Sequence, residues 1–369
     1  MIFWLWAACA TPHDSGDTDP DTADSGDTAD SGDTDTDTAD SGDTDTAETA
    51  WCTTAAVTFA PLDGEPVDVT TELTTGQYLT LDQPGTLHVC PGTWFAHVVL
   101  RASVVVQGEG AAPDDVVLSG GESGTILDVL GPDVTLEVRD LRLDRGAGLQ
   151  VEHNSGGGGI YCEGDATVLG EDLRFTDNFA NDGAGLYARE CAVTLRRVEF
   201  ADNLVDDDGG ALTLWYSTAT LEAVSFVRNR ALDAGAFALF YSDATVTDGT
   251  FTDNEASHFA GAVWVYESTL SATASHFATN EGGEAGGAVL LAGQGTFADV
   301  TIEDNTSTQG GGIFVYWEST ITATATTILG NLQEDLFVAD YVNEAGGHPM
   351  EGQADWNFVC AANECTTTE

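Results

Sequence analysis

The sequence contains no lysine, and its ten basic residues are all arginines. Against them stand 62 aspartates and glutamates, which give a formal net charge of −52. A surface this acidic repels the phosphates of nucleic acids and of anionic lipid headgroups. We therefore expect no nucleic-acid partner, and we expect membrane contact only through a covalent anchor.

Long apolar runs are also missing. Residues 1–8, MIFWLWAA, form an apolar segment that is too short to span a bilayer. The segment resembles the end of a bacterial lipoprotein signal, with Cys9 at the position that carries the lipid, although Trp6 stands where Leu is preferred. Two alternatives follow: an exported lipoprotein of the outer membrane or cell surface, or a secreted protein with a spare cysteine.

No pair of cysteines has the CxxC spacing typical of zinc sites, and no metal site is expected from them. Six cysteines follow Cys9, and an even number in an exported chain indicates disulfides. Many pairings are possible. We expect the three that join sequence neighbours, namely Cys52–Cys90, Cys162–Cys191 and Cys360–Cys365.

Residues 9–50 have little that could form a core. The segment is rich in Asp, Thr, Ser and Gly, and no apolar residue after Cys9 is larger than Ala or Pro. Such composition predicts a disordered linker, and behind an anchor it would act as a stalk. Asp33, Asp35 and Asp37 resemble the start of a calcium loop, but the Gly and closing Glu of such a loop are absent. We expect no cofactor, with calcium as the weak exception.

The folded sequence begins near Trp51 and contains a repeat. An Asn recurs at intervals that alternate between 25 and 26 residues, each preceded at the third position by Phe or Ile. A glycine-rich corner such as GGAL (209–212) opens each repeat. The recurring residues are Asn178, Asn203, Asn229, Asn254, Asn280, Asn305 and Asn331.

Each repeat contains three short pieces with the alternation of a strand, such as Leu212–Leu214, Thr220–Leu221 and Val224–Phe226. Pieces this short are stable only if each stacks on its counterpart in the next repeat. The sequence therefore predicts an all-β fold, a parallel β-helix solenoid over residues 51–331 with three strands per turn of about 25 residues. Residues 332–369 would cap its open end.

The Asn, Gly and Phe residues that recur in each repeat would form columns along the solenoid, and each column has a structural explanation. Asn tolerates the left-handed conformation of a tight corner, and its amide can bond to the Asn of neighbouring turns as a ladder. The glycines permit positive φ or close packing at the next corner. The Phe column, which includes Phe175, Phe200 and Phe226, is expected to lie in the core.

The motifs GGA[ILV] and FxxN resemble the repeat of chlamydial polymorphic outer-membrane proteins, within the right-handed parallel β-helix (pectate-lyase-like) superfamily. FTDN, FADN, FVRN and FATN match this pattern over residues 157–331. The resemblance implies a surface-exposed, adhesin-type β-helix. Those proteins carry a C-terminal autotransporter barrel, and here a lipid anchor would replace it as the means of display.

Catalytic motifs of this superfamily are missing. The sequence contains no RxPxxR segment of pectate lyases and no NTD or GHG segment of polygalacturonases. Their absence weakens an enzymatic interpretation. Glu267 and Glu318 remain as weak catalytic candidates, because about two turns separate them and glycosidases use carboxylate pairs.

The strand after each glycine corner alternates between inward apolar residues and residues that must point away from the core. Aromatic side chains dominate the outward set, where polar ones are expected. The strip consists of Tyr161, Tyr187, Trp215, Tyr216, Phe240, Tyr241, Trp264, Tyr266, Phe314, Tyr316 and Trp317.

An exposed aromatic strip on a rigid sheet is suited to stacking on sugar rings, with Glu163, Asp243, Glu267 and Glu318 as hydroxyl acceptors. We therefore expect non-catalytic binding of a polysaccharide or a surface protein. Two alternatives remain: a polysaccharide lyase or hydrolase, and a purely structural surface protein. The strip could also be covered by the loop at 148–157 or the C-terminal tail, or could simply stabilise the sheet.

Overall fold

We analysed a computed structural model of the chain. It describes residues 50–53, 56–148, 156–316, 319–340, 343–350, 353–361 and 364–367, with side chains described between Trp51 and Phe337. The described residues belong to one compact unit spanning residues 47–369. Cys9, the predicted stalk and the predicted loop around His153 lie outside them.

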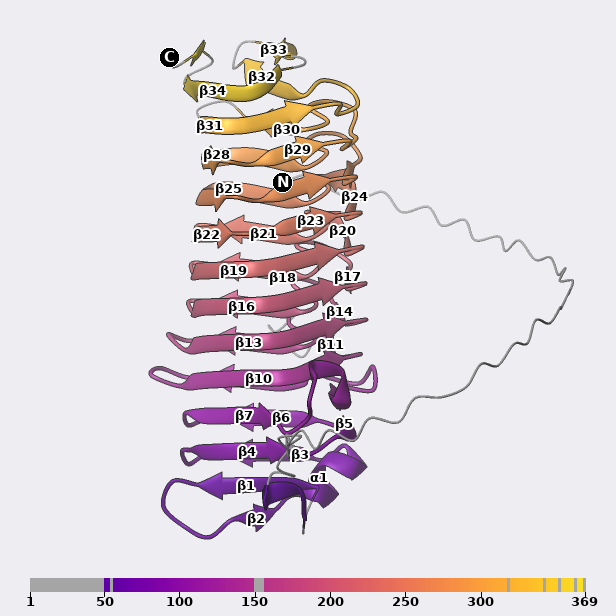
Figure 1. Cartoon of the computed structure of the whole chain (residues 1–369), viewed down its shortest axis with the longest axis vertical. Coiled ribbons are helices and arrows are strands. Elements are labelled where there is room, and N and C mark those ends of the chain that lie inside the picture. The colour runs from indigo at the N-terminus through magenta and orange to yellow at the C-terminus, as the bar shows by residue number, and fades with distance from the viewer. Residues whose placement is uncertain are drawn as a thin grey trace, which may run out of the picture. The chain divides into compact units, whose positions relative to one another are not determined.

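The described residues form a β-solenoid in which successive turns of the chain stack on one another (Figure 1). Its first turns contain η1 (Ala50–Thr53), β1 (Val57–Pro61), β2 (Val67–Asp68), α1 (Thr70–Thr75), β3 (Tyr78–Leu81), β4 (Gly85–Val89), β5 (Gly92–Phe95), β6 (His97–Leu100), β7 (Val104–Gly108), η2 (Pro113–Asp115) and β8 (Val116–Ser119). No described helix is long and apolar enough to cross a membrane.

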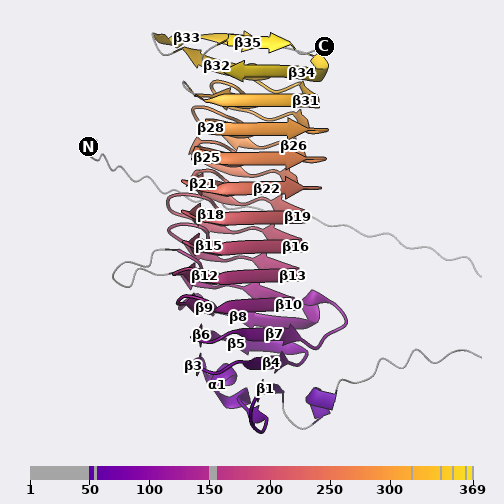
Figure 2. The same ribbon diagram turned by 90° about the vertical axis from the view of Figure 1, so that its left-hand side faces the viewer.

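Short strands form one side of the solenoid, seen beside the long strands in Figure 2. They pair in parallel, each with its counterpart in the next turn. These strands are β9 (Leu127–Leu130), β12 (Ile160–Glu163), β15 (Leu186–Arg189), β18 (Leu212–Trp215), β21 (Phe237–Phe240), the first residues of β25 (Val263–Thr273) and β28 (Val289–Ala298), β30 (Ile313–Val315) and β32 (Leu336–Asp340).

Longer strands follow the short ones in each turn. They are β10 (Thr135–Asp144), β13 (Thr167–Thr176), β16 (Ala192–Ala201), β19 (Thr218–Val227), β22 (Asp243–Thr247) with β23 (Thr250–Thr252), the rest of β25 with β26 (His276–Ala278), the rest of β28 with β29 (Thr301–Glu303), and β31 (Thr320–Leu329). The second and third predicted strand pieces are thus halves of one strand, which bends where Ala223 adopts positive φ.

A separate six-stranded sheet contributes one strand to each of six successive turns. Its members are β11 (Ala147–Gly148), β14 (Phe179–Ala180), β17 (Leu204–Val205), β20 (Arg230–Asp233), β24 (Glu255–Phe259) and β27 (Glu281–Gly282). The repeat pattern did not predict this sheet, because most of its strands are too short to show an alternation.

The core is one apolar column along the solenoid. Phe175, Phe200, Phe226, Phe251 and Phe277 have no exposed surface, and their rings stack with centroids 4.4–4.9 Å apart. The predicted position of the Phe column is therefore confirmed. Each turn buries its apolar face only against its neighbours, as in other solenoids.

The predicted asparagine ladder is also present. Asn203 Nδ2 donates to Asn229 Oδ1 at 2.9 Å and to the Phe175 carbonyl at 3.0 Å, while Asn229 Oδ1 also accepts from the Asn203 backbone N–H. The pattern repeats from Asn178 to Asn331 and satisfies these buried amides.

The predicted backbone conformation of the asparagines is wrong. Positive φ occurs one residue earlier, at Asp202 (φ 57°) and Arg228 (φ 54°), for example. Asn is required here for its paired donor and acceptor rather than for a left-handed turn. The glycine prediction is confirmed: Gly183 has φ 51°, and a Cβ on Gly235 would lie 2.2 Å from the Gly261 carbonyl oxygen.

Two predicted disulfides, Cys52–Cys90 and Cys162–Cys191, are formed. The third stays a prediction, because the side chains of Cys360 and Cys365 lie outside the described residues, although their backbones are paired.

Antiparallel strands lie at both ends of the solenoid. β1 pairs antiparallel with β4 at the first end, and at the other end β33 (Asn343–Met350) and β34 (Gln353–Ala361) pair antiparallel with β32 and β31, with β35 (Glu364–Thr367) on β34.

Candidate functional site

The sheet of short strands positions the predicted aromatic strip. Its inward residues are buried as predicted, with Leu212, Leu214, Phe237 and Leu239 fully inaccessible. The alternate residues therefore point away from the core, in the direction predicted from the sequence.

Several outward side chains are nevertheless covered by the protein itself. Tyr161, Phe240 and Phe314 are only 2%, 4% and 6% exposed. Ala234 packs against Phe240, and Ala260 and Ala285 belong to the cluster that buries Phe314. The cover of Phe240 and Phe314 comes from the corner segments after β20, β24 and β27. Phe314 also stacks on Phe337 of β32, which belongs to the C-terminal segment considered in the sequence.

The aromatic rings contact one another across turns. Trp215 stacks on Phe240 with centroids 4.4 Å apart, and Phe240 meets Trp264 edge-on at 5.3 Å. Beside them, Tyr216 stacks on Tyr241 at 5.0 Å. Tyr216 and Tyr241 are 56% and 38% exposed and both adopt positive φ, so they project beyond the ends of their strands.

The register differs from a simple column of Trp215, Phe240 and Trp264. These residues lie in successive turns of one sheet, but Phe240 pairs with Tyr266, whereas Trp264 pairs with the buried Ala238. A ligand along the solenoid axis would therefore not contact the three rings in line.

An aromatic cavity of about 380 Å³ opens in the later turns. Its wall combines outward residues of the short strands with residues of the corner segments. The lining residues are Phe259, Trp264, Tyr266, Glu284, Ala285, Leu290, Ala292, Gln309, Phe314 and Tyr316.

A second, more polar cavity of about 670 Å³ lies beside the first and shares Tyr266, Ala292 and Tyr316 with it. We call the two together the groove. The second cavity is lined by Tyr241, Ser242, Asp243, Tyr266, Glu267, Ser268, Thr269, Ala292, Gly293, Gln294, Tyr316 and Ser319. Volumes of this size are typical of small-molecule sites, which range from about 300 to 1,000 Å³.

The groove has acidic polar groups at its edges. His258 places Nε2 3.4 Å from Glu284 and Nδ1 3.1 Å from the buried Asp233, and its ring lies on Phe259. Desolvation, followed by the charge of Glu267, raises the pKa of Tyr241. The groove thus pairs aromatic surface with carboxylates that can accept hydrogen bonds from hydroxyl or ammonium groups.

The structure distributes the predicted site residues unevenly. Tyr241, Trp264, Tyr266, Phe314, Tyr316 and the weak catalytic candidate Glu267 line the groove. Trp215, Tyr216 and Phe240 belong to the adjoining ring contacts. Trp317 and Glu318 lie outside the described residues.

Tyr161 and Tyr187 form a separate stacked pair, with centroids 5.6 Å apart, in the earlier strands β12 and β15. Burial raises the pKa of both hydroxyls. This pair does not line the groove.

Sequence reasoning missed Phe259, Glu284 and Gln309. They lie just before the glycine corners of three successive turns and follow the 25-residue period, but their residue types differ, so no common motif marks them. An aromatic residue shortly before the glycine corner, as at Phe259, was the available signal.

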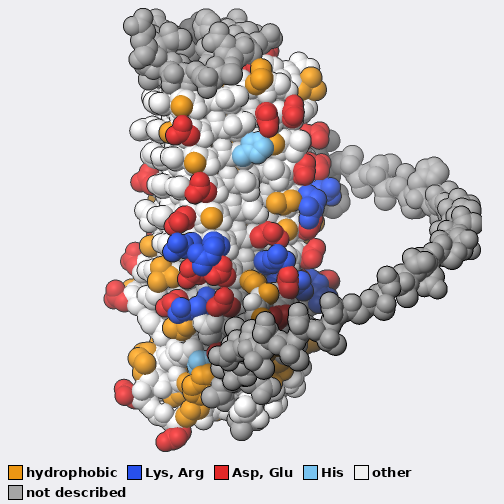
Figure 3. Space-filling view, viewed as in Figure 1, with side chains coloured by type: hydrophobic (Ala, Val, Ile, Leu, Met, Phe, Trp, Pro, Cys, Tyr) orange, Lys and Arg blue, Asp and Glu red, His pale blue; other side chains and the backbone are white. Residues whose placement is uncertain are grey.

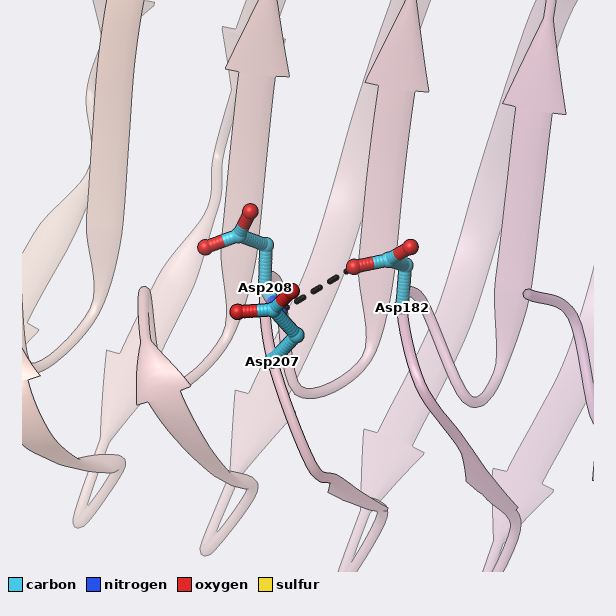
Figure 4. Close-up of side chains that lie close together, drawn as sticks. All are labelled: Asp182, Asp207 and Asp208. Atoms are coloured by element: carbon cyan, nitrogen blue, oxygen red, sulfur yellow. Dashed lines mark hydrogen bonds between the residues drawn. The ribbon is translucent and has the colours of Figure 1, made fainter. Parts of the chain in front are cut away.

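A cluster of aspartates lies outside the groove. Asp182, Asp207 and Asp208 each offer a carboxylate oxygen within 4.8 Å of the others (Figure 4). Burial, followed by the charges of Asp207, Asp182 and Asp233, raises the pKa of Asp208 to about 8. Oxygens in this arrangement are those that could hold a divalent cation.

Comparison with known proteins identifies the fold region. Residues 158–332 match the family model of the right-handed β-helix region. This match and the parallel stacking of the turns define the solenoid as a right-handed parallel β-helix. No curated protein and no solved structure matches the chain.

Proposed function

We propose that the protein is an exported surface protein that binds glycans non-catalytically through the groove. The observation that carries the proposal is the juxtaposition of Tyr266 and Tyr316, which line both cavities, with the carboxylates of Glu267 and Glu284. Aromatic faces cover the apolar face of a sugar ring, and carboxylates accept its hydroxyl hydrogen bonds.

The rigid scaffold favours such binding. The short strands hold Tyr266 in register with Phe240, whose inward neighbour Leu239 is fully buried. Because the rings are held before the ligand arrives, less conformational entropy is lost on binding.

The same proposal includes display at the cell surface. The acidic segment 9–50 would act as a spacer and Cys9 as the lipid anchor, in an adhesin-type arrangement like that of polymorphic outer-membrane repeat proteins within the pectate-lyase-like superfamily. Changing Cys9 to Ser would release the protein from the membrane fraction if this part is correct.

The binding proposal is tested with the full chain on an array of neutral, amino and acidic oligosaccharides. A double variant, Tyr266→Ala with Tyr316→Ala, should weaken binding of any hit by more than about tenfold, because buried aromatic anchors carry most of the energy of a contact. Tyr78→Ala is the matched control, since Tyr78 is 68% exposed and lies on β3, away from the groove.

Retained affinity in the double variant would contradict the groove as the binding site. Product analysis of each hit decides between binding and catalysis. Cleavage that disappears in Glu267→Gln would replace the proposal with a polysaccharide lyase or hydrolase.

A further inference from the structure

Positive charge is segregated along the solenoid. The ten arginines lie between Arg101 and Arg230, and no lysine or arginine follows Arg230 in the sequence. On the face shown in Figure 3, the arginine side chains occupy the middle turns and leave the uppermost described turns without one. The groove lies in these arginine-free turns, because its lining begins at Tyr241.

The charged side chains that line the groove are all carboxylates: Asp243, Glu267 and Glu284. Among the ion pairs of the described residues, none involves Asp243 or Glu267, and Glu284 pairs only with His258. An anionic ligand would meet uncompensated repulsion here, whereas a cationic ligand would supply the missing counter-charge.

The aromatic wall of the groove also favours a positively charged ligand. Trp264 and Tyr266 lie with centroids 6.1 Å apart at 73°, and Phe314 and Tyr316 lie 6.2 Å apart at 44°. Ring faces set at steep angles around one space attract an ammonium group through their negative quadrupoles.

We propose that the groove selects glycans with free, protonated amino groups, that is, amino sugars that are not N-acetylated, and rejects polyuronates. This inference rests on the proposed glycan-binding function and narrows it to one charge class. The sugar rings would cover the aromatic wall, while the ammonium groups would pair with Glu267 and Glu284. An N-acetylated ring would fill the same space and offer its hydroxyls, but it would leave those carboxylates without an opposite charge.

The test measures binding of the full chain to three probes of equal length: hexamers of glucosamine, N-acetylglucosamine and galacturonate. We expect the glucosamine hexamer to bind at least about tenfold more tightly than the N-acetylated one, because hydrogen bonds between charged groups are the stronger ones. The galacturonate hexamer should show no binding. Affinity for glucosamine should fall as NaCl rises from about 20 mM to about 500 mM, since salt screens exposed charges.

Two variants locate the charge effect. Glu267→Gln and Glu284→Gln should each weaken glucosamine binding by roughly fivefold and weaken binding of the N-acetylated hexamer much less, so that the preference for glucosamine narrows. Glu281→Gln is the matched control, because Glu281 is an exposed carboxylate in β27, close in sequence to Glu284, that lines neither cavity.

The outcomes separate the two levels of the proposal. Equal binding of the glucosamine and N-acetylated hexamers, galacturonate binding, or an unchanged preference in both Gln variants would overturn the charge selectivity alone. No binding of any hexamer would overturn glycan binding and the selectivity together. A preference for glucosamine that both Gln variants reduce, and that Glu281→Gln retains, supports both.

Discussion

The arginine-bearing turns, residues 101–230, and the arginine-free turns, residues 231–337, share one backbone but have different surfaces. In the first, Arg228 pairs with Asp202 of the preceding turn at 2.7 Å. In the second, the described ion pairs formed within the region involve His258 and His276, and aromatic rings line a groove. The phenylalanine stack and the asparagine ladder continue through both. The two regions therefore share their buried columns, whereas their outward residues differ from turn to turn.

The largest expected effect tests the shared core. Phe200→Ala in the arginine-bearing turns and Phe251→Ala in the arginine-free turns should each cost about 3–5 kcal/mol of unfolding free energy, because each opens a cavity between two stacked rings. Denaturant unfolding of the full chain measures both. If the two variants lose clearly different amounts of unfolding free energy, the phenylalanine stack does not stabilise the two regions equally.

An intermediate effect is expected at the aspartate cluster. The pKa of Asp208 is raised to about 8 in the folded protein, from an ordinary value of 3.8. Between these values the folded state keeps a proton that the unfolded state has lost, so stability decreases as pH rises from about 4 to about 8. Asp208→Asn removes this penalty and should be more stable than the parent by about 1–3 kcal/mol at about pH 9.

The advantage of Asp208→Asn should shrink toward about pH 5, where the parent carboxyl is protonated in the fold. Unfolding curves at the two pH values measure the difference. Glu222→Gln, at an exposed carboxylate of β19, is the control. A gain that does not change with pH would show that Asp208 does not carry the effect.

The smallest effect is expected at the surface ion pairs that distinguish the two regions. Arg228→Gln removes two hydrogen bonds to Asp202, of 2.8 and 2.7 Å, but both side chains are largely in solvent. The loss should be about 0.5 kcal/mol or less and should vanish in roughly 0.5 M salt. A loss comparable to that of Phe200→Ala would mean that the arginines stabilise their turns after all.

The repeat made much of the fold predictable. A buried Phe must recur with the turn, and Asn178 to Asn331 recur with it because each amide bonds to the next. The position of the left-handed residue was wrongly predicted, since the neighbouring Asp or Arg adopts that conformation while Asn supplies the hydrogen bonds. Both a left-handed corner and a ladder of side-chain hydrogen bonds favour Asn at this position. The sequence alone therefore does not show which of the two is the reason for Asn.

The candidate site was less predictable. Alternation correctly gave the outward direction of Trp264, Tyr266 and Tyr316, because direction depends on the strand's own period. Whether an outward ring is covered depends on another segment: Ala234 covers Phe240, whereas Tyr266 stays 36% exposed. The covering residues Ala234, Ala260 and Ala285 recur with the repeat, but the sequence does not show which outward ring each of them contacts, so these contacts follow only from the structure.

The antiparallel strands at the two ends give the solenoid a fixed length. β1 on β4 and β34 on β31 occupy edges where another parallel turn would otherwise add, so copies of the protein are not templated to join end to end. A longer solenoid would then arise by duplication of a whole repeat inside the gene, and not by addition of turns at the ends. Each such duplication would extend the solenoid by about 4.8 Å and keep every column in register. Extra residues between strands can also be accommodated, since β10 and β13 pair in register although 32 residues separate the bonded Gly146 and Asn178. Duplication of repeats before the groove would therefore change the distance between the first turn and the groove by whole multiples of the spacing between turns.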